Sequence, residues 1–398
     1  MNDDKKLNVI IHRGTAQIGG ICTEIAAENT RIFFDFGLPL EGEGDQSILS
    51  IDGLTTGTIN ADAVFLTHYH GDHVGQIYDV AESVPIYMEE TAKKILEKYQ
   101  DHMKNHITSQ WAKSANAIKV GMPVKIKDLQ ITAIASDHSA ADSVMFLVEG
   151  YNKRILITGD YRMHGFYRDK LEEALTNLGH IDLMITEGTS ISRDSEYYHD
   201  ENWVEEQFRE LLHDYKYCFL LTSSSGLDRI ASFSRSVPRG KYMLADDYQY
   251  AQMQIYDETR DAKLKSNKVN YMSEYNREGA EKRGFGMVVR ANDKFMPIVR
   301  QYFEKYPDKT CLIYSMWSGY RDKPAIAQML DICKGQEKTV HVSGHITKED
   351  LENVIATVKP KKLIVYHTSA EEKDLTSVEI PSETELLTPT DAEIVTLI

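Results

Sequence analysis

Three histidines and an aspartate are crowded into six consecutive positions, directly after a short apolar run. The four side chains are His68, His70, Asp72 and His73. Imidazole and carboxylate groups are the side chains that first-row divalent metal ions favour. In an extended segment His68 and His70 point to the same side, so both can bind one ion. The other two lie past the turn at Gly71, which predicts a second ion and hence a two-metal site.

A simpler explanation of a His-x-His pair is two surface histidines on a polar turn. For such a pair alone this explanation would be the better one. Four metal-type side chains beside the apolar run 63–66 are seldom explained that way, so the metal site is favoured. Further ligands are then expected at other strand ends.

The composition is that of an ordinary globular protein. The chain has 398 residues, 42% hydrophobic and 27% charged, which is long enough for two domains. No stretch approaches the length of a signal-peptide core or a transmembrane helix. Four scattered cysteines form no Cys-x-x-Cys pair, so neither a disulfide framework nor a thiolate zinc site is indicated. We therefore expect a cytoplasmic protein with reduced thiols and no membrane partner.

The charge distribution bears on nucleic-acid binding. A net charge of −16 argues against a surface coated with basic residues for nucleic acid. Between Arg260 and Lys294, however, basic residues are interleaved with aromatic ones. This stretch is either a solvated surface or a patch that faces a substrate.

The elements that must position the metal-type side chains can be predicted from apolar patterning. An N-terminal β meander is expected at residues 7–11, 22–26 and 31–35, and an amphipathic helix at 90–100. Further strands are expected at 123–126, 129–136, 143–148 and 154–158, the last two joined by a hairpin at 150–152. The polar, glycine-rich stretch 38–60 is expected to be a long loop near the mouth of the site.

Five more strands end in polar side chains of the metal-binding or acid–base type. His138 follows the strand 129–136, and Asp160 follows the strand 154–158. Glu187 follows a strand at 183–186, and residues 341–345, which include Ser343, Gly344 and His345, end another. His367 follows a strand at 363–366. Rigid strands that present polar residues at their ends are a common way to build a site.

These residues resemble the motifs of a known family. The pattern His-x-His-x-Asp-His, with His138 and Asp160 downstream, resembles the metallo-β-lactamase fold. Glu187, the Ser-Gly-His at 343–345 and His367 are similar to the three extra motifs of its β-CASP subgroup, and closest to ribonuclease J. The resemblance implies an αββα sandwich with an inserted α/β β-CASP domain. The expected division is 1–192 and 338–398 for the sandwich, and 193–337 for the insert.

Alternating helices and strands in the middle of the chain agree with an α/β insert. Helices are expected at 203–215 and 324–333, and strands at 217–222 and 310–315. A serine-rich loop at 223–226 precedes a helix that contains Arg229, which is similar to an arginine of the β-CASP domain.

The resemblance also implies a ligand set. One zinc would be held by His68, His70 and His138, the other by Asp72, His73 and His367, with Asp160 bridging. Zinc is preferred because most of the ligands are imidazoles, with manganese as the alternative. A hydroxide between the two ions would attack phosphorus in line while the metals take up developing charge.

The resemblance assigns catalytic roles to Asp72, Glu187 and His345. Glu187 would accept a hydrogen bond from a ligand imidazole, with a helix cap as its alternative role. His345, with Ser343 and Gly344, would bind the scissile phosphate, and its imidazolium would protonate the leaving oxygen. Taken alone, His345 would be a structural loop histidine.

The expected function is a zinc-dependent phosphodiesterase, a ribonuclease J-like exonuclease or endonuclease. RNA is the expected substrate and single-stranded DNA the second choice, since His367 is the variant of RNA-processing members. One alternative is a hydrolase of a small ester, thioester or lactone, which would not need the inserted domain. Another is a non-catalytic RNA-binding protein on a decayed scaffold, against which the full ligand set speaks. A homodimer is left open.

Overall fold

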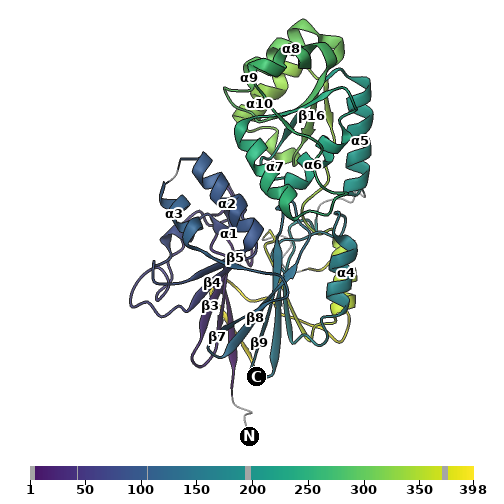
Figure 1. Ribbon diagram of the computed structural model, residues 1–398. Helices are drawn as coiled ribbons and strands as arrows, with labels where there is room; N and C mark the ends of the chain where they lie inside the picture. The colour runs from purple at the N-terminus through teal and green to yellow at the C-terminus, as the bar shows by residue number, and fades with distance from the viewer. Residues whose placement is uncertain (1–4, 43, 105, 193–198, 370–374) are drawn as a thin grey trace. The chain divides into compact units, whose positions relative to one another are not determined.

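The computed structural model describes residues 5–42, 44–104, 106–192, 199–369 and 375–398 (Figure 1). The chain forms two compact units. The first contains Met1–Met163, Tyr167–Ser195 and Gly344–Ile398, and the second contains His164–Phe166 and Glu196–Ser343. The domain limits expected from the motifs, at 192 and 338, stay a prediction.

One sheet of the first unit begins with the expected N-terminal meander. Its strand order is β20-β1-β2-β3-β4-β5-β6. The strands are β1 (Leu7–Arg13), β2 (Cys22–Ala26), β3 (Arg31–Phe34), β4 (Ala63–Leu66), β5 (Ile86–Glu89), β6 (Asn116–Ile118) and β20 (Ile394–Leu397). Strands β1 to β3 pair antiparallel, and β3 to β6 pair parallel. The edge strand β20 pairs with β1 from the far end of the chain.

The second sheet of this unit has the order β19-β18-β11-β10-β9-β8-β7. Its strands are β7 (Pro123–Ile126), β8 (Leu129–Ala135), β9 (Val144–Gly150), β10 (Lys153–Ile157), β11 (Leu183–Glu187), β18 (Lys362–Tyr366) and β19 (Glu385–Leu386). The expected hairpin joins β9 to β10 through Tyr151 and Asn152, at φ 51° and 58°. Two left-handed residues in a two-residue loop give the turn whose twist matches that of the paired strands.

The two sheets pack face to face. Phe34 and Phe65 of the first sheet contact Phe146 of the second, with ring centroids 5.4 and 5.6 Å apart, inside one shared apolar core. Helices α2 (Glu90–His102) and α3 (His106–Ser114) cover the outer side of one sheet. Helices α4 (Arg168–Thr176) and α11 (Lys348–Val358) cover the other (Figure 1). The expected αββα sandwich is confirmed.

The second unit is a parallel sheet with helices on both faces. The strand order is β14-β13-β15-β12-β16-β17. The strands are β12 (Tyr217–Thr222), β13 (Tyr242–Ala245), β14 (Asn270–Tyr271), β15 (Phe285–Val289), β16 (Thr310–Ser315) and β17 (Glu337–Thr339). The helices are α5 (Glu201–Asp214), α6 (Leu227–Ser236), α7 (Asp247–Thr259), α8 (Glu274–Arg283), α9 (Met296–Lys305) and α10 (Pro324–Cys333). The alternation of helix and strand expected from the sequence is confirmed.

One expected strand is shorter than the sequence suggested. Strand β17 stops at Thr339, and residues 341–345 form a loop. Backbone pairing with β16 continues for only one further hydrogen bond, from Val340 N to Tyr314 O at 3.0 Å. The Ser-Gly-His segment is therefore presented by a loop, not by the strand itself.

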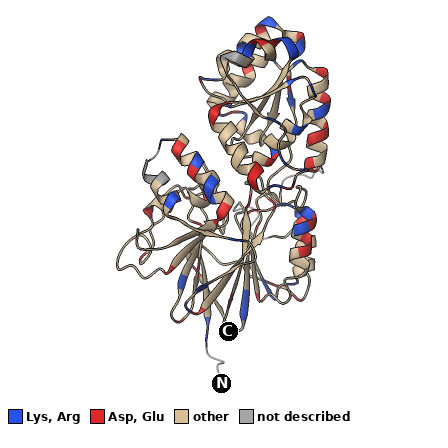
Figure 2. Ribbon diagram, in the orientation of Figure 1, with Lys and Arg blue, Asp and Glu red and all other residues tan. Residues whose placement is uncertain are grey.

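The charged residues and the cysteines are distributed as follows. Acidic and basic residues are interspersed along the helices of both units (Figure 2). In the basic stretch 260–294, Arg290 and Lys294 both pair with Asp246, so these two cations are partly neutralised. All four cysteines are buried and unpaired with each other. None of the helices in the described ranges has the length and apolar composition needed to cross a bilayer.

Candidate metal centre

The seven predicted metal ligands all lie at strand ends or in the short turns that follow strands of the first unit. His68 and His70 lie in the loop after β4, and Asp72 and His73 lie in the short helix α1 (Gly71–Val74). The other three follow three strands of the second sheet: His138 after β8, Asp160 after β10 and His367 after β18. The sandwich thus brings together side chains that are up to 299 positions apart, from residue 68 to residue 367.

The potential ligand atoms form overlapping groups, within each of which they lie within 4.8 Å of one another. The groups are His68, His70 and His138; Asp72, His73, Asp160 and His367; and His138, Asp160 and His345. Asp160, a member of the second group, also lies close to the first. Its Oδ2 is 3.2 Å from His73 Nε2 and 3.9 Å from His68 Nε2. Its Oδ1 is 3.8 Å from His367 Nε2. A carboxylate that bridges two ions needs this position.

Buried polar atoms without hydrogen bonds test whether metal ions fit this cluster. His68 Nε2, His73 Nε2 and both carboxylate oxygens of Asp160 are buried and lack a hydrogen-bond partner. Leaving such atoms unsatisfied is costly, and native proteins seldom do so. Bound cations would satisfy all four. The donor set of imidazoles and carboxylates suits divalent transition metals, so the residues present fit the metal.

Burial keeps the imidazoles of the first group in the neutral form that binds metals. Burial, followed by the neighbouring imidazoles, holds the pKa of His68 and of His138 well below the ordinary value. Burial also lowers the pKa of His70 to about 4. A neutral imidazole offers a lone pair, which is the ligand form.

The second group is more strongly charged. Burial alone would lower the pKa of His73, but Asp160, Asp35 and Asp72 together raise it well above the ordinary value. Burial would raise the pKa of the carboxyl groups of Asp160 and Asp72, yet the adjacent imidazoles, His73 and His367 foremost, lower both. The carboxylates are therefore ionised, and they would attract a divalent cation as they attract the His73 proton.

Hydrogen bonds away from the cluster fix the orientation of two histidines. Asp35 Oδ2 accepts from His73 Nδ1 at 2.8 Å, and the same carboxylate accepts from the backbone N–H and the hydroxyl of Thr67. Since the Thr67 hydroxyl donates to Asp35, it accepts from His68 Nδ1 at 3.0 Å. Both rings therefore turn Nε2 toward the cluster, as is usual for metal-binding imidazoles whose other ring nitrogen donates a hydrogen bond.

Two more rings are oriented in the same way. The Gly344 carbonyl accepts from His138 Nδ1 at 2.6 Å. The Thr189 hydroxyl donates to the His367 carbonyl and accepts from His367 Nδ1 at 2.6 Å. His367 has φ 51°, and Asp35 has φ 58°. Left-handed conformations of residues other than glycine are unusual and are found most often at functional sites.

Backbone contacts hold the short helix α1 against the neighbouring loops. Phe36 N donates to the His73 carbonyl at 2.7 Å, and Ile21 N donates to the Asp72 carbonyl at 3.1 Å. A Cβ on Gly37 would overlap the Asp72 carbonyl. Only glycine allows this approach, which places the two ligands of α1 against the rest of the cluster.

Glu187 and His345 lie together beside the metal-type side chains. Glu187 is fully buried, and its Oε2 accepts from His345 Nδ1 at 2.9 Å while Oε1 accepts from the Tyr161 backbone N–H at 2.8 Å. The predicted contact of Glu187 with an imidazole is thus present, but the imidazole is that of His345 and not one of the seven expected ligands. His345 Nδ1 is 3.6 Å from Asp160 Oδ2, and the side chain is 23% exposed.

The other predicted substrate-binding residues are placed as follows. Gly344 packs against Ser139 and His138. The carbonyl of Ser343, which belongs to the second unit, accepts from His164 Nε2 at 2.8 Å. Their roles toward a substrate stay predictions.

Sequence reasoning missed the residues that orient the ligands. Asp35 was only the last residue of the strand expected at 31–35, and Thr67 and Thr189 were given no role. Their signal in the sequence is weak, because each is a single polar residue, and the imidazoles that Asp35 and Thr189 contact lie 38 and 178 positions away. Asp35 was the easiest of the three to predict, because it is an acid that directly follows an apolar strand and precedes Phe-Gly.

Comparisons with known proteins support the family. A model described as "Beta-lactamase superfamily domain" matches residues 54–214. Among curated relatives, "Probable RNase MJ4" of Methanocaldococcus jannaschii is 25% identical over 197 residues, 45% of either chain. "Protein artemis" of Gallus gallus is 28% identical over 40% of this chain and 22% of its own. "DNA cross-link repair protein pso2/snm1" of Schizosaccharomyces pombe is 27% identical over 30% of this chain and 22% of its own.

The chain thus spans less than half the length of these curated relatives. Among solved structures, a protein of unknown function from Enterococcus faecalis V583 superposes with a TM-score of 0.77 at 21% identity. The match covers 98% of this chain and all of that one, and it shows the shared fold. The matched model, the sandwich and the motifs agree, and the chain is similar to metallo-β-lactamase-fold proteins of the β-CASP subgroup.

Proposed function

We propose that this chain is a metal-dependent phosphodiesterase that cleaves RNA, in the manner expected of a ribonuclease J-like enzyme. The observation that carries the proposal is the joint placement of seven metal-type side chains with His345, held by Glu187, at their edge. A small-ester hydrolase would need the metals but neither Glu187, His345 nor the insert expected at 193–337.

The ligand assignment is part of the proposal. One Zn²⁺ would be held by the three histidines of the first group, a second by Asp72, His73 and His367, and Asp160 would bridge them. When bound, two such ions supply an activated water as nucleophile and stabilise negative charge on a phosphate. Mn²⁺ is the alternative ion.

His345 is the residue proposed to meet the scissile phosphate. Glu187 accepts from Nδ1, so the other ring nitrogen, Nε2, is the atom that could donate to a phosphate oxygen or to the leaving oxygen. Ring centroids place His345 5.2 Å from His138 and 5.9 Å from His367, next to both ligand groups. Asp72 would act as a ligand, and Glu187 as the residue that positions His345.

RNA is proposed over DNA because of His367 and because one relative is named a probable RNase. DNA is the second candidate, favoured by the relative whose name states DNA cross-link repair. The two differ in the ribose 2′-hydroxyl, so matched oligonucleotides of one sequence distinguish them.

The test is hydrolysis of a 5′-monophosphorylated RNA and of the matched single-stranded DNA by the zinc-loaded full chain. We expect RNA cleavage, with a product ladder that tells an exonuclease from an endonuclease. His345→Ala should lower kcat about 100-fold, as loss of a positioned proton donor does, while bound zinc is retained. His213→Ala, a histidine with an 84% exposed side chain at the end of α5, is the control and should cleave like the wild type.

Cleavage of DNA alone would replace the RNA proposal with the second candidate. Full activity of His345→Ala would contradict the phosphate role. No cleavage of either polymer by protein that holds two metals would contradict the nuclease proposal and leave the small-ester hydrolase.

A further inference from the structure

An exposed tryptophan and a partly buried tyrosine form a pair in the second unit, in the loop after β16. Trp317 is 40% exposed, and its ring centroid lies 5.3 Å from that of Tyr320 at an interplanar angle of 85°. This is an edge-to-face pair. Large aromatic side chains dominate the energetics of interfaces, and one left in solvent on a loop is a candidate contact for a ligand.

The loop holds the indole in place. The Tyr314 hydroxyl donates to the Trp317 carbonyl at 2.7 Å, and a short 3-10 turn, Ser318–Tyr320, follows at once. A Cβ on Gly319 would overlap three ring carbons of Trp317, so the ring lies directly on the loop backbone. The tryptophan is therefore both exposed and preorganised, which reduces the entropy lost on binding.

Cationic groups adjoin the two rings. The ammonium of Lys323, an exposed residue, lies 4.6 Å from the Tyr320 ring centroid. The Arg321 guanidinium lies 4.6 Å from the Tyr314 ring and pairs with Glu337. Asp322 is the one acid between them in sequence. A cationic ligand would be repelled by Lys323, so the aromatic pair favours a ligand that combines a planar ring with negative charge.

The topology places this loop where parallel sheets bind ligands. Strands β12 and β16 are parallel neighbours, and Thr222 at the end of β12 is paired with Ser315 at the end of β16. The chain leaves β12 for α6, which packs with α5, and leaves β16 for α10, which packs with α9 on the other face (Figure 1). Adjacent strands whose connections leave on opposite faces mark a topological switch point.

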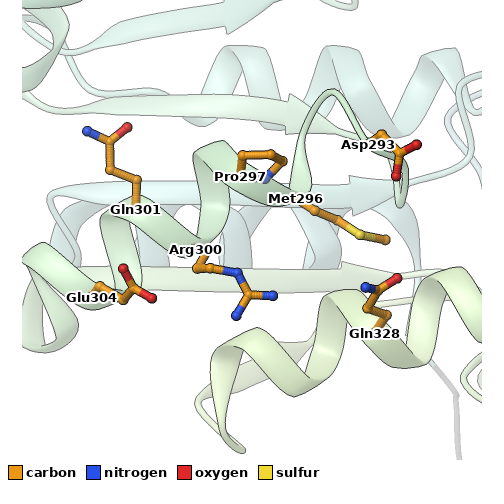
Figure 3. Close-up of a pocket in the computed structure, with 7 residues that line it drawn as sticks. All are labelled: Asp293, Met296, Pro297, Arg300, Gln301, Glu304 and Gln328. Carbon is orange, nitrogen blue, oxygen red and sulfur yellow. The ribbon is translucent and has the colours of Figure 1, made fainter.

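A pocket between α9 and α10 is a poorer candidate for such a ligand. It is lined by Asp293, Met296, Pro297, Arg300, Gln301, Glu304 and Gln328 (Figure 3). Its single cation, Arg300, is set against two carboxylates, and the lining contains no aromatic ring. Neither stacking nor net positive charge is available there.

We propose that Trp317, with Tyr320 and Lys323, is a stacking platform for one base of single-stranded RNA, with Lys323 beside the adjoining phosphate. Stacking of a base on an aromatic ring needs no particular sequence, and a nearby lysine adds a salt-dependent contribution. The inference rests on the proposed function, since RNA is the substrate proposed for the metal centre.

The test measures binding apart from cleavage. A short fluorescein-labelled 2′-O-methyl oligoribonucleotide is titrated by anisotropy against the full zinc-loaded chain and its variants. Trp317→Ala should raise Kd about 5- to 100-fold, the range expected for loss of one stacked base, and Trp317→Phe should recover most of the affinity. Lys323→Gln should reduce the slope of log Kd against log salt by about one. Tyr99→Ala, a residue 38% exposed on α2 of the other unit, should bind within twofold of the wild type.

Cleavage of unlabelled RNA by the wild type separates the two proposals. If the wild type cleaves RNA but Trp317→Ala binds within twofold, the platform is contradicted and the nuclease stands. An equal loss in Trp317→Ala and Trp317→Phe would also contradict stacking, because phenylalanine can still stack. If the wild type neither cleaves nor binds RNA, both proposals fail together.

Discussion

Each unit contains a cluster of buried polar side chains, and the two clusters differ in how they are satisfied. In the second unit, Arg229 is 7% exposed and forms two hydrogen bonds with Glu201, at 3.1 and 2.7 Å. It also donates to the Ser315 hydroxyl and to the Val342 carbonyl, and its Nη1 lies 3.2 Å from His341 Nδ1. In the first unit, the metal-type cluster leaves both oxygens of Asp160 and two imidazole nitrogens without hydrogen bonds.

This difference is the one expected between a cluster that stabilises the fold and a cluster that holds metal ions. The guanidinium of Arg229 meets a carboxylate in a bidentate pair, which is the arrangement that stabilises a buried charge. In the cluster around Asp160, the outer hydrogen bonds are made through Asp35, Thr67 and Thr189. The atoms on the inner side of the cluster face one another. A metal site requires side chains that are oriented by hydrogen bonds on their outer atoms and whose atoms facing the ion have no other partner.

Removal of metal is expected to have the largest effect. Treatment with a chelator should lower RNA cleavage by about 1,000-fold or more, because the ions supply several kcal/mol of transition-state stabilisation. Zn²⁺ added back should restore the rate. The measurement is initial velocity before chelation, after chelation and after readdition. A rate unchanged by chelation, with metal loss verified by elemental analysis, would rule out metal-dependent catalysis.

Truncation of Arg229, in the cluster of the second unit, should instead lower the free energy of unfolding. Arg229→Met is expected to lower the free energy of unfolding by about 3–5 kcal/mol, because Glu201 would be left buried without its partner. The double variant Arg229→Met/Glu201→Leu should recover part of the loss. Urea denaturation followed by circular dichroism measures both, and zinc content per folded chain should stay that of the wild type. Loss of zinc with unchanged stability would reverse the assignment of the two clusters.

Loss of the Asp35 carboxylate, which accepts from His73 Nδ1, should have an intermediate effect. Asp35→Asn is expected to weaken zinc affinity about 10- to 100-fold, because His73 and Thr67 lose a charged acceptor. Competition with a zinc-binding dye measures the affinity directly. The control is Asp62→Asn, a carboxylate that pairs with Lys127 away from the cluster and should leave affinity unchanged. Equal affinity in both variants would mean that Asp35 does not orient a ligand.

The smallest effect is expected for Glu187→Gln. The amide can still accept from His345 Nδ1, but a neutral acceptor is weaker than a carboxylate, so kcat should fall only about 5- to 10-fold. KM and zinc content should be unchanged. Glu172→Gln, an exposed change on α4, is the matched control. A drop in zinc content would assign Glu187 to the metal, and not to His345.

The clustering of the metal-type side chains could be predicted from the sequence, whereas the residues that orient them could not. His68 to His73 form one local pattern, and His138, Asp160 and His367 each follow an apolar strand, so spacing and strand ends were sufficient. The contact of Asp35 with His73 depends on the parallel pairing of β3 with β4 and on a left-handed φ at Asp35. Neither the strand pairing nor the φ angle of Asp35 can be inferred from the local pattern of apolar residues.

The pairing of the C-terminal strand and the contact of Gly344 could not be predicted for the same reason. The residues of β20, Ile394–Leu397, are typical of a strand, but local sequence does not show that this strand pairs with β1, nearly the whole chain away. The role of Gly344 in binding substrate stays a prediction, while the contact of its carbonyl with His138 Nδ1, 206 positions away, could not be read from the sequence. Long-range closures of this kind follow from the tertiary fold and not from the motif.

The measurement that tests the central claim most directly is the zinc content of the purified full chain at neutral pH, beside that of Asp160→Asn. The unsatisfied atoms around Asp160 predict two zinc ions per wild-type chain and a clear loss in the variant, with the circular dichroism spectrum unchanged. Fewer than one ion per chain in the wild type, or equal content in both proteins, would contradict the assignment of this cluster as a two-metal centre.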